Sequence, residues 1–318
     1  MSDLSCKVAI VGAGYMAREH IRAFQDVPGV TVVGVHSRTR AKAEALAKEF
    51  GPIAVYDSVD ELYEKTKADL VVVAVPELSV NQVCKGCFAH PWVALIEKPA
   101  GYNLADAQDI EAAARYLNRR AFVALNRRHY GSTRAVLSDL ENCSGPRLIK
   151  VQDQEAPIAA LEAGQPELVV QNWMYANSIH VIDYFSIFAR GKVTNVAQTI
   201  RFDRVRPRYV AATIKFDSGD VGLYEAIWDG PGPWTVSVNT DEKRWEMRPL
   251  EKAAYQLAGT RVLQPAPDEV WDTQFKPGLR YQAQMAVQAV HAAKGQPAGL
   301  PTLQEALESM RLTHAIYS

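Results

Sequence analysis

The N-terminal part of the chain alternates short, uninterrupted apolar runs with segments in which apolar residues recur every three to four positions. Such runs predict strands buried on both faces, and the periodic segments predict helices. The predicted strands are 7–11, 30–36, 53–56, 70–75, 93–97 and 122–125. The predicted helices are the stretch that ends at Phe24, then 41–50, 59–65, 79–88 and 104–117. This alternation predicts a doubly wound parallel α/β sheet over residues 1–126.

After Asn126 the rhythm changes to shorter runs joined by turns, such as DSGD at 217–220. Strands that follow one another through short turns predict an open, mostly antiparallel sheet. The predicted strands are 148–152, 196–202, 209–216, 221–227 and 234–240, and the predicted helices are 132–140, 178–188, 278–294 and 303–317. Residues 127–318 are therefore expected to form a single α+β domain.

Composition and charge exclude several classes of partner. With 318 residues, 48% hydrophobic and 22% charged, the chain has the composition of a globular protein of two domains. Its net charge is −1 and its Lys and Arg do not cluster, so no nucleic-acid or membrane partner is expected. No apolar run approaches the roughly 20 residues of a membrane span, and 8–11 is too short for a signal peptide. A cytoplasmic location is the expectation.

The cysteines Cys6, Cys84, Cys87 and Cys143 fit a reducing compartment without disulfides. Cys84 and Cys87 form a C-x-x-C, which is either a redox pair or half of a metal site, or else two small residues on the buried face of a helix. No second C-x-x-C or His pair completes a zinc set, so packing is favoured and no metal is expected.

A glycine-rich turn, GAGYMA at 12–17, directly follows the first predicted strand and opens a helix. In that context it fits the dinucleotide-binding fingerprint of a Rossmann domain. Gly12 permits the tight turn, Gly14 lets the backbone approach a pyrophosphate, and Ala17 is small enough for helix–strand packing. The phosphates would lie on the amides of the helix N-terminus. The alternative is a turn that needs glycine for its geometry alone.

The end of the second strand selects between the two nicotinamide cofactors. It reads HSRTR at 36–40 and lacks the carboxylate that would hold the ribose hydroxyls of NAD. Ser37 can donate to a 2′-phosphate, and Arg38 can pair with it or stack on adenine. We therefore expect NADP, although NAD remains possible if the arginines only face solvent.

Glu97, Lys98 and Pro99 lie at the carboxyl end of the fifth strand, the edge where ligands bind in an open α/β sheet. A partly desolvated lysine there, with a lowered pKa, could exchange protons with a substrate hydroxyl. The alternative is a surface lysine at a strand end. The residues expected to bind the cofactor are Gly12, Gly14, Tyr15, Met16, Ala17, Ser37, Arg38, Pro76, Glu97 and Lys98.

Together these motifs resemble the glucose–fructose oxidoreductase / inositol dehydrogenase / MocA (Gfo/Idh/MocA) family over nearly the whole chain. The motifs that carry the resemblance are 12–17 with His20, 69–76, 97–101, 126–128, 180–183 and 302–306. The resemblance implies a Rossmann domain followed by an open-sheet domain that binds substrate and supports oligomerisation, so a homodimer or homotetramer is expected.

The resemblance also implies site residues. Lys98 would touch the nicotinamide ribose and the reacting oxygen, and the Lys98–Pro99 bond would be cis. His180 would face the substrate, although a histidine satisfied inside a helix bundle is the alternative. Asp183, one helical turn later, would orient that imidazole or cap local backbone groups.

The chain departs from the family pattern at Ala176, where many relatives carry an aspartate four residues before the histidine. The Lys–Asp–His set used for polyol oxidation is therefore incomplete. Asn177 can hydrogen-bond a hydroxyl but cannot act as a base. Tyr175 would replace the missing acid as a proton donor, or it would only pack against the sheet. The catalytic candidates are thus Lys98, His180 and Tyr175.

The segment 173–177, WMYAN, together with Arg127, Arg128 and His129, predicts a pocket of mixed aromatic and basic character. It would suit a hydroxylated ring that carries an anionic group, unless these arginines only bridge the domains. The residues expected to bind substrate are Lys98, Arg127, Trp173, Asn177, His180 and Asp183.

Three functions are compatible with these residues. The favoured one is an NAD(P)-dependent oxidoreductase that transfers hydride to or from a sugar, sugar derivative or polyol. The alternative is a non-catalytic dinucleotide-binding sensor of the same fold, favoured by Ala176 and opposed by the presence of Lys98 and His180. Reduction of an imine or a linear tetrapyrrole is the third, because fold alone does not fix the substrate.

Overall fold

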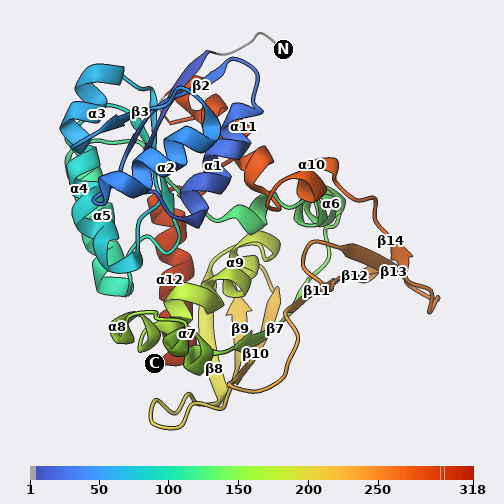
Figure 1. The fold of residues 1–318 in the computed structure, drawn as a ribbon. Helices are drawn as coiled ribbons and strands as arrows, with labels where there is room; N and C mark the ends of the chain where they lie inside the picture. Colours follow the sequence, from blue (N-terminus) through green and yellow to red (C-terminus); the bar gives the residue numbers. More distant parts are fainter. Residues whose placement is uncertain (1–4, 294, 297) are drawn as a thin grey trace. The chain divides into compact units, whose positions relative to one another are not determined.

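The computed structural model describes residues 5–293, 295–296 and 298–318 (Figure 1). The chain divides into two compact units, and the first break falls directly after Asn126. Unit 1 holds the residues up to Asn126 and Trp271–Leu307, and unit 2 holds Arg127–Val270 and Glu308–Ser318. The sequence predicts a second domain that is continuous from 127 to 318. The structure differs, because residues 271–307 belong to unit 1.

Unit 1 is built on a parallel sheet of six strands in the order β3-β2-β1-β4-β5-β6. Its strands are β1 (Cys6–Val11), β2 (Val30–His36), β3 (Ala54–Tyr56), β4 (Leu70–Val73), β5 (Val93–Glu97) and β6 (Ala121–Ala124). All pairs are parallel. This order is that of the Rossmann fold, in which ligands bind where the strand order reverses, between β1 and β4. The predicted doubly wound sheet is confirmed.

Helices cover both faces of this sheet, because residues on both sides of its central strands are buried. Val8 and Ile10 of β1 belong to one buried cluster, and Ala9 and Val11 belong to the other. The helices of the N-terminal segment are α1 (Tyr15–Gln25), α2 (Arg40–Phe50), α3 (Val59–Thr66), α4 (Val80–Phe88) and α5 (Leu104–Tyr116). Strand residues therefore alternate between two helical layers, as the pleat of a strand requires.

Helix α11 (Leu279–His291) completes the first of these layers, beside α1. Arg280 Nε donates to Asp26 Oδ2 at 2.5 Å, and Asn126 Nδ2 donates to the carbonyl of Pro277 at 3.0 Å. The apolar periodicity predicted this helix but not which core it would cover. Lys294, where the helix was expected to end, lies outside the described residues.

Unit 2 contains an eight-stranded sheet in the order β14-β13-β12-β11-β7-β10-β9-β8. Its strands are β7 (Leu148–Glu155), β8 (Val193–Ile200), β9 (Tyr209–Phe216), β10 (Val221–Trp228), β11 (Thr235–Asn239), β12 (Lys243–Met247), β13 (Ala253–Leu257) and β14 (Gln264–Pro265). Only β7 and β10 pair in parallel among these strands, so the predicted mostly antiparallel sheet is confirmed. The predicted strand 196–202 lies instead at Val193–Ile200.

Helices of unit 2 cover one face of that sheet. They are α6 (Gly131–Leu140), α7 (Pro157–Glu162), α8 (Glu167–Val170) and α9 (Ile179–Phe188), with a turn of π-helix, η3 (Met174–Ser178), leading directly into α9. Helix α12 (Leu303–Tyr317) begins in unit 1 and ends in unit 2. Within the described ranges, no helix is long and apolar enough to cross a membrane.

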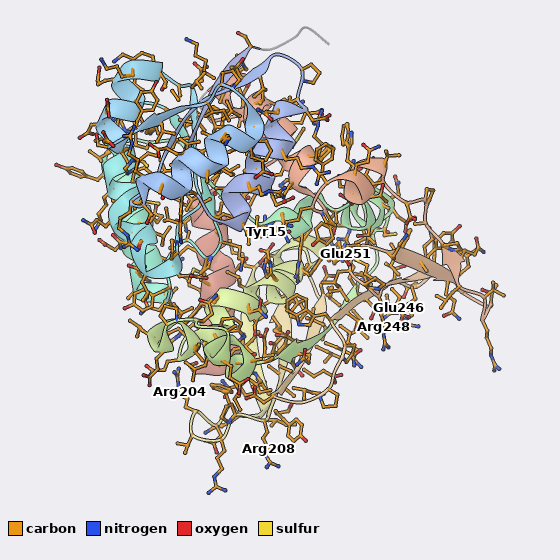
Figure 2. The ribbon with its side chains drawn as sticks, in the orientation of Figure 1. Tyr15, Arg204, Arg208, Glu246, Arg248 and Glu251 are labelled. Carbon is orange, nitrogen blue, oxygen red and sulfur yellow. The ribbon has the colours of Figure 1, made fainter. Side chains whose placement is uncertain are left out.

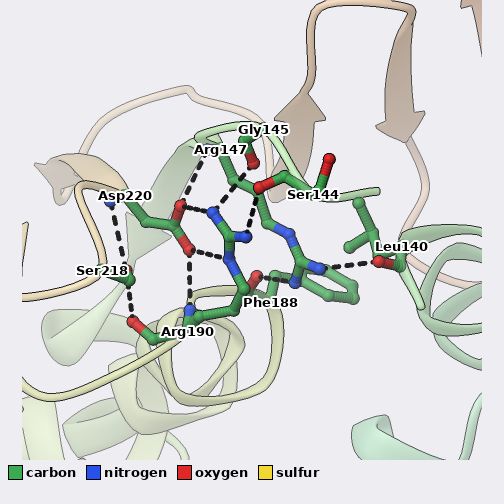
Figure 3. A network of polar contacts seen from close by, with 8 residues as sticks. All are labelled: Leu140, Ser144, Gly145, Arg147, Phe188, Arg190, Ser218 and Asp220. Carbon is green, nitrogen blue, oxygen red and sulfur yellow. Dashed lines mark hydrogen bonds and ion pairs between the residues drawn. The ribbon is translucent and has the colours of Figure 1, made fainter. Parts of the chain in front are cut away.

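A polar network fixes the C-terminal end of α9 in unit 2 (Figure 3). Arg190 Nη2 contacts Asp220 Oδ1 at 2.6 Å, and Arg147 donates to the carbonyls of Phe188 at 2.8 Å and Leu140 at 2.7 Å. Burial alone would raise the pKa of Asp220, but hydrogen bonds from Arg190 and from the Arg147 amide hold it below its usual value. The network thus satisfies a fully buried carboxylate.

Both cysteines of the C-x-x-C, Cys84 and Cys87, are buried on α4 within the second core cluster. Burial raises the pKa of Cys87 to about 12, so this thiol stays protonated and inert at neutral pH. The interpretation as packing residues therefore agrees with their environment.

Candidate functional site

The glycine turn after β1 has a geometry that only glycine can supply at its first position. Gly12 has φ +121°, and a Cβ built there would lie 2.0 Å from the carbonyl oxygen of Ala74. The Gly12 amide donates to the carbonyl of His36 at 2.8 Å, and the Ala74 amide donates to that of Val11 at 2.8 Å. The turn is therefore held between the ends of β2 and β4, at the reversal point of the sheet.

The N-terminus of α1 presents the features of an anion site. Gly14 is its N-cap residue, and a Cβ built there would meet nothing within 4 Å. The amides of Tyr15, Met16 and Ala17 precede the first intrahelical bond, which runs from Arg18 to the Gly14 carbonyl at 3.1 Å. No acidic residue occupies the first turn. The open space at Gly14 and these amides therefore fit a dinucleotide pyrophosphate.

Tyr15, labelled in Figure 2, lies in the first turn of α1, and 62% of its surface is exposed. The ammonium of Lys276 lies 5.4 Å from the centre of its ring. Ala17 is fully buried, consistent with its predicted packing role. Pro76 is exposed and follows β4 directly, on the same edge of the sheet as the glycine turn.

The arginines after β2 have different surroundings. Arg40 Nε donates to Glu44 at 2.8 Å, and its guanidinium also pairs with Asp57. Arg38 is exposed, and within the described residues its side chain makes no hydrogen bond or ion pair. Ser37 Oγ accepts from the Thr39 amide at 3.4 Å. Arg38 is therefore the cation at this strand end that is available to a ligand.

Glu97 and Lys98 follow one another at the end of β5 but have different environments. The Glu97 carboxylate is buried and lies 2.6 Å from Nε2 of buried His20 on α1. Lys98 is half-buried, and the Lys98–Pro99 bond is cis, as predicted. Glu97 thus joins α1 to β5 through a polar contact, while Lys98 stands at the carboxyl edge of the sheet.

In unit 2 the π-helical turn η3 carries Tyr175 and Asn177. The Tyr175 hydroxyl lies 2.9 Å from Nδ1 of His314, and burial raises the pKa of the phenol. The neutral phenol is thus the stable form at neutral pH. Asn177 Nδ2 donates to Glu155 Oε2 at 2.8 Å. π-Helical turns occur often at functional sites, and this one immediately precedes His180.

Arg127 Nη1 and Trp173 Nε1 are among the buried donors of unit 2 that have no hydrogen-bond partner within the described residues. The guanidinium carbon of Arg127 lies 4.1 Å from the ring centre of Trp234, and the imidazole of His180 lies 6.2 Å from the same ring. Arg127, Trp234 and His180 therefore form one cluster. Buried donors without a protein partner point to a water or ligand that would accept from them.

Asp183 is held by hydrogen bonds from two other side chains of unit 2. Its carboxylate accepts from Arg128 Nε at 2.7 Å and Arg128 Nη2 at 2.7 Å, and it also accepts from Ser309 Oγ at 2.7 Å. The residue is 2% exposed. Such a bidentate pair holds the helix α9 against its neighbours. We therefore propose a structural role for Asp183.

Replacing Asp183 with Asn is accordingly expected to lower the free energy of unfolding by about 2 kcal/mol, because the charge-assisted pair with Arg128 is lost. Urea unfolding followed by circular dichroism measures this loss. The matched control is Asp268→Asn, because Asp268 is 52% exposed in its ion pair with Lys252 and should leave the unfolding midpoint unchanged. Equal midpoints for D183N and wild type would show that Asp183 does not stabilise the unit.

Fold and turn together define unit 1 as a dinucleotide-binding Rossmann domain, and sequence comparison agrees. Residues 6–125 match the family described as "Oxidoreductase family, NAD-binding Rossmann fold" (GFO_IDH_MocA). Over this N-terminal domain the chain is similar to the Gfo/Idh/MocA oxidoreductases, as its motifs predicted. Its cofactor class is a nicotinamide dinucleotide.

Two individual relatives match only part of the chain. The chain is 29% identical over 123 residues to glucose-6-phosphate 3-dehydrogenase of Bacillus subtilis, covering 39% of this chain and 34% of that protein. It is 32% identical over 112 residues to inositol 2-dehydrogenase 1 of Saccharopolyspora erythraea, covering 34% of this chain and 33% of that protein. The chain thus spans about a third of the length of these curated relatives.

The whole fold has counterparts among solved structures. An oxidoreductase from Thermotoga maritima superposes with a TM-score of 0.79 at 18% identity, covering 98% of this chain and 95% of that one. At this identity the likeness shows the fold, and it extends through both units.

Sequence reasoning missed Trp234 as a member of the candidate site, together with the carboxyls Asp153 and Glu155 beneath it. Trp234 was predicted only as the start of a strand. Asp153 and Glu155 are respectively 1% and 0% exposed on β7. An available signal was the i, i+2 spacing of these acids on the buried face that begins with Ile149 and Val151.

Proposed function

We propose that the chain is an NAD(P)-dependent oxidoreductase that transfers hydride to or from a carbinol or carbonyl carbon of a sugar, sugar derivative or polyol. The observation that carries the proposal is the buried Arg127 Nη1, which has no hydrogen-bond partner within the described residues and belongs to the cluster of Arg127, Trp234 and His180; Trp173 Nε1 is a second such donor of unit 2. Such donors suit hydroxyl and phosphate oxygens and do not suit an apolar ligand.

The dinucleotide, when bound, supplies or accepts the hydride. Gly12 and Gly14 shape the turn, the first-turn amides of α1 bind the pyrophosphate, and Ser37 and Arg38 bind the adenosine end. Pro76 and the β5 end lie at the carboxyl edge where the nicotinamide half is expected.

Lys98 and His180 would manage the proton of the reacting hydroxyl. Lys98 donates to the oxygen and polarises it, and His180 accepts or returns the proton. Ala176 provides no carboxylate, so the imidazole of His180 has no aspartate four residues before it. Tyr175 is bound to His314, so its contribution as a proton donor would run through that contact.

The names of the two relatives, glucose-6-phosphate 3-dehydrogenase and inositol 2-dehydrogenase, favour a polyhydroxylated ring as the substrate class. Arg127 adds a preference for an anionic substituent, because its guanidinium is only partly used by Trp234 and binds phosphate well.

The test is turnover of glucose 6-phosphate, myo-inositol and their keto forms with NADP(H) and NAD(H), followed at the absorbance of the reduced nicotinamide. Turnover of any of these compounds supports the proposal. Dinucleotide binding without turnover across a broad panel of sugars, together with a stable protein partner in a pulldown, would favour the non-catalytic sensor instead.

Replacing Arg38 with Ala is expected to weaken NADPH binding about tenfold, the loss of roughly one charge-assisted hydrogen bond, and to leave NADH binding unchanged. Titration of reduced-nicotinamide fluorescence measures both affinities. Arg40→Ala is the matched control, because Arg40 is already paired with Glu44 and Asp57. If wild type binds NADH as tightly as NADPH, the preference for NADP is wrong, although the enzyme proposal stands.

A further inference from the structure

Strand β7 carries an unusual inner face. Its buried positions alternate as Ile149, Val151, Asp153 and Glu155, so the apolar face becomes acidic at its C-terminal end. Burying a carboxyl group is costly unless hydrogen bonds replace the lost water. The partners of Asp153 and Glu155 therefore indicate what these residues hold in place.

Glu155 is bonded to the π-helical turn that precedes His180. Its Oε2 accepts from Asn177 Nδ2 at 2.8 Å, and its Oε1 accepts from Ser178 Oγ at 2.9 Å. The contact fixes which edge of the Asn177 amide faces the sheet. Within the described residues the amide oxygen of Asn177 accepts no hydrogen bond, so that edge stays available to a hydroxyl group.

Asp153 is bonded to the aromatic cluster. Its Oδ1 accepts from Trp234 Nε1 at 2.6 Å, and its Oδ2 accepts from the Tyr224 hydroxyl at 2.6 Å. The indole it holds is the ring against which Arg127 and His180 lie. Rotation of Trp234 would therefore disturb both of these candidate substrate residues.

A continuous hydrogen-bond chain joins the two carboxyls. The Tyr224 hydroxyl lies 2.7 Å from the Tyr317 hydroxyl, which lies 3.2 Å from Ser178 Oγ. Burial, followed by the charge of Asp153, raises the pKa of Glu155 well above its usual value. A neutral glutamine can therefore replace Glu155 and keep a side-chain oxygen that accepts from Asn177.

We propose that Asp153 and Glu155 are positioning residues of the substrate site, Glu155 orienting the Asn177 amide and Asp153 orienting the Trp234 indole between Arg127 and His180. This inference rests on the proposed function and adds to it the groups that fix the geometry of the polyol-binding residues. Such supporting hydrogen bonds set the precision with which a site holds its ligand.

The proposal predicts that substitutions at these carboxyls weaken substrate binding and leave dinucleotide binding unchanged. Glu155→Leu removes the acceptor of Asn177 while keeping the side-chain volume, so KM for glucose 6-phosphate or myo-inositol should rise roughly tenfold, the equivalent of about one hydrogen bond. The NADPH dissociation constant should stay within about threefold, because the dinucleotide residues lie in unit 1. Glu155→Gln should restore KM, since its amide oxygen can still accept from Asn177. Asp153→Asn provides a second variant, which is expected to shift the indole N–H resonance of Trp234.

The matched control is Glu225→Leu, the same change on the opposite face of the sheet, where Glu225 is exposed on the strand next to β7. Kinetics and fluorescence titration are combined with the Trp234 indole N–H resonance, identified by its absence in Trp234→Phe. A raised KM in E155L, its recovery in E155Q, and a moved indole resonance in D153N support the proposal. Unchanged KM in folded E155L, or failure of E155Q to restore it, would overturn the proposal.

Failure of the proposed function would give a different result from failure of the positioning proposal. Wild type would then turn over no sugar or polyol of the panel, while its Asn177 side-chain amide resonances would still move in E155L. In that case the carboxyls only stabilise the turn, and their positioning of a substrate site is rejected together with the function.

Discussion

Replacing Lys98 with Met is expected to lower kcat/KM by a factor of about 10²–10⁴, the usual contribution of one positioned proton-transfer group. Methionine keeps the length of the side chain and removes the ammonium, so the reacting oxygen would lose its proton partner. Lys98 is half-buried at the carboxyl end of β5, and its neighbour Glu97 is already bonded to His20. Steady-state kinetics with the best substrate of the panel measures the loss.

Two controls separate chemistry from folding at this strand end. NADPH affinity should stay within a few-fold in K98M, because the proposed sites for the pyrophosphate and the adenosine end are on α1 and after β2. Lys85→Met replaces an exposed lysine of α4 that pairs with Asp109, and it should leave kcat/KM unchanged. Turnover of K98M at the wild-type rate would remove the lysine from the mechanism.

The sheet of unit 1, which lies within the residues up to Asn126, could be predicted from its apolar runs to within one or two residues at most strand ends. Strand β5 was placed at 93–97, where the structure has it, because all five residues are buried. Strand β4 ends at Val73, before the predicted end, because the chain turns toward Pro76. A strand that is buried on both faces is read as a continuous apolar run, so its ends can be located in the sequence.

Unit 2 was predicted less completely because its strands have a weaker pattern of apolar residues. Strand β12 was missed since only Trp245 and Met247 of its five residues are buried. Strand β7 was predicted to end at Gln152 but continues to Glu155, because hydrogen bonds satisfy the two carboxyls that break its apolar alternation. Tertiary partners of this kind cannot be read from a single sequence.

The residues of the candidate site also divide into those that could be predicted from the sequence and those that could not. The glycine turn and Arg38 could be found because local geometry and charge determine what they do. The bond between Tyr175 and His314 joins residues far apart in the chain, as does the pairing of Asp183 with Arg128. A side chain whose role depends on a distant partner leaves no local signal.

Gly12→Ala is expected to destabilise unit 1 by at least about 3 kcal/mol, because the new Cβ adds backbone strain and steric overlap at once. Gly12 has φ +121°, and the Cβ would lie 2.0 Å from the Ala74 carbonyl oxygen, a backbone atom that cannot rotate away. The turn would have to open between the ends of β2 and β4. Urea unfolding monitored by circular dichroism measures the loss, and NADPH titration should show little or no binding.

Gly14→Ala is the matched variant that tells folding from cofactor binding. Its Cβ would meet nothing within 4 Å, and its φ of −95° suits any residue, so the free energy of unfolding should be unchanged. The added methyl would nevertheless occupy the space through which a pyrophosphate approaches the α1 amides. NADPH binding should therefore weaken at least roughly tenfold in a fully folded protein, an effect of about 1.4 kcal/mol. Unweakened binding in G14A would show that the dinucleotide phosphates do not lie on this turn.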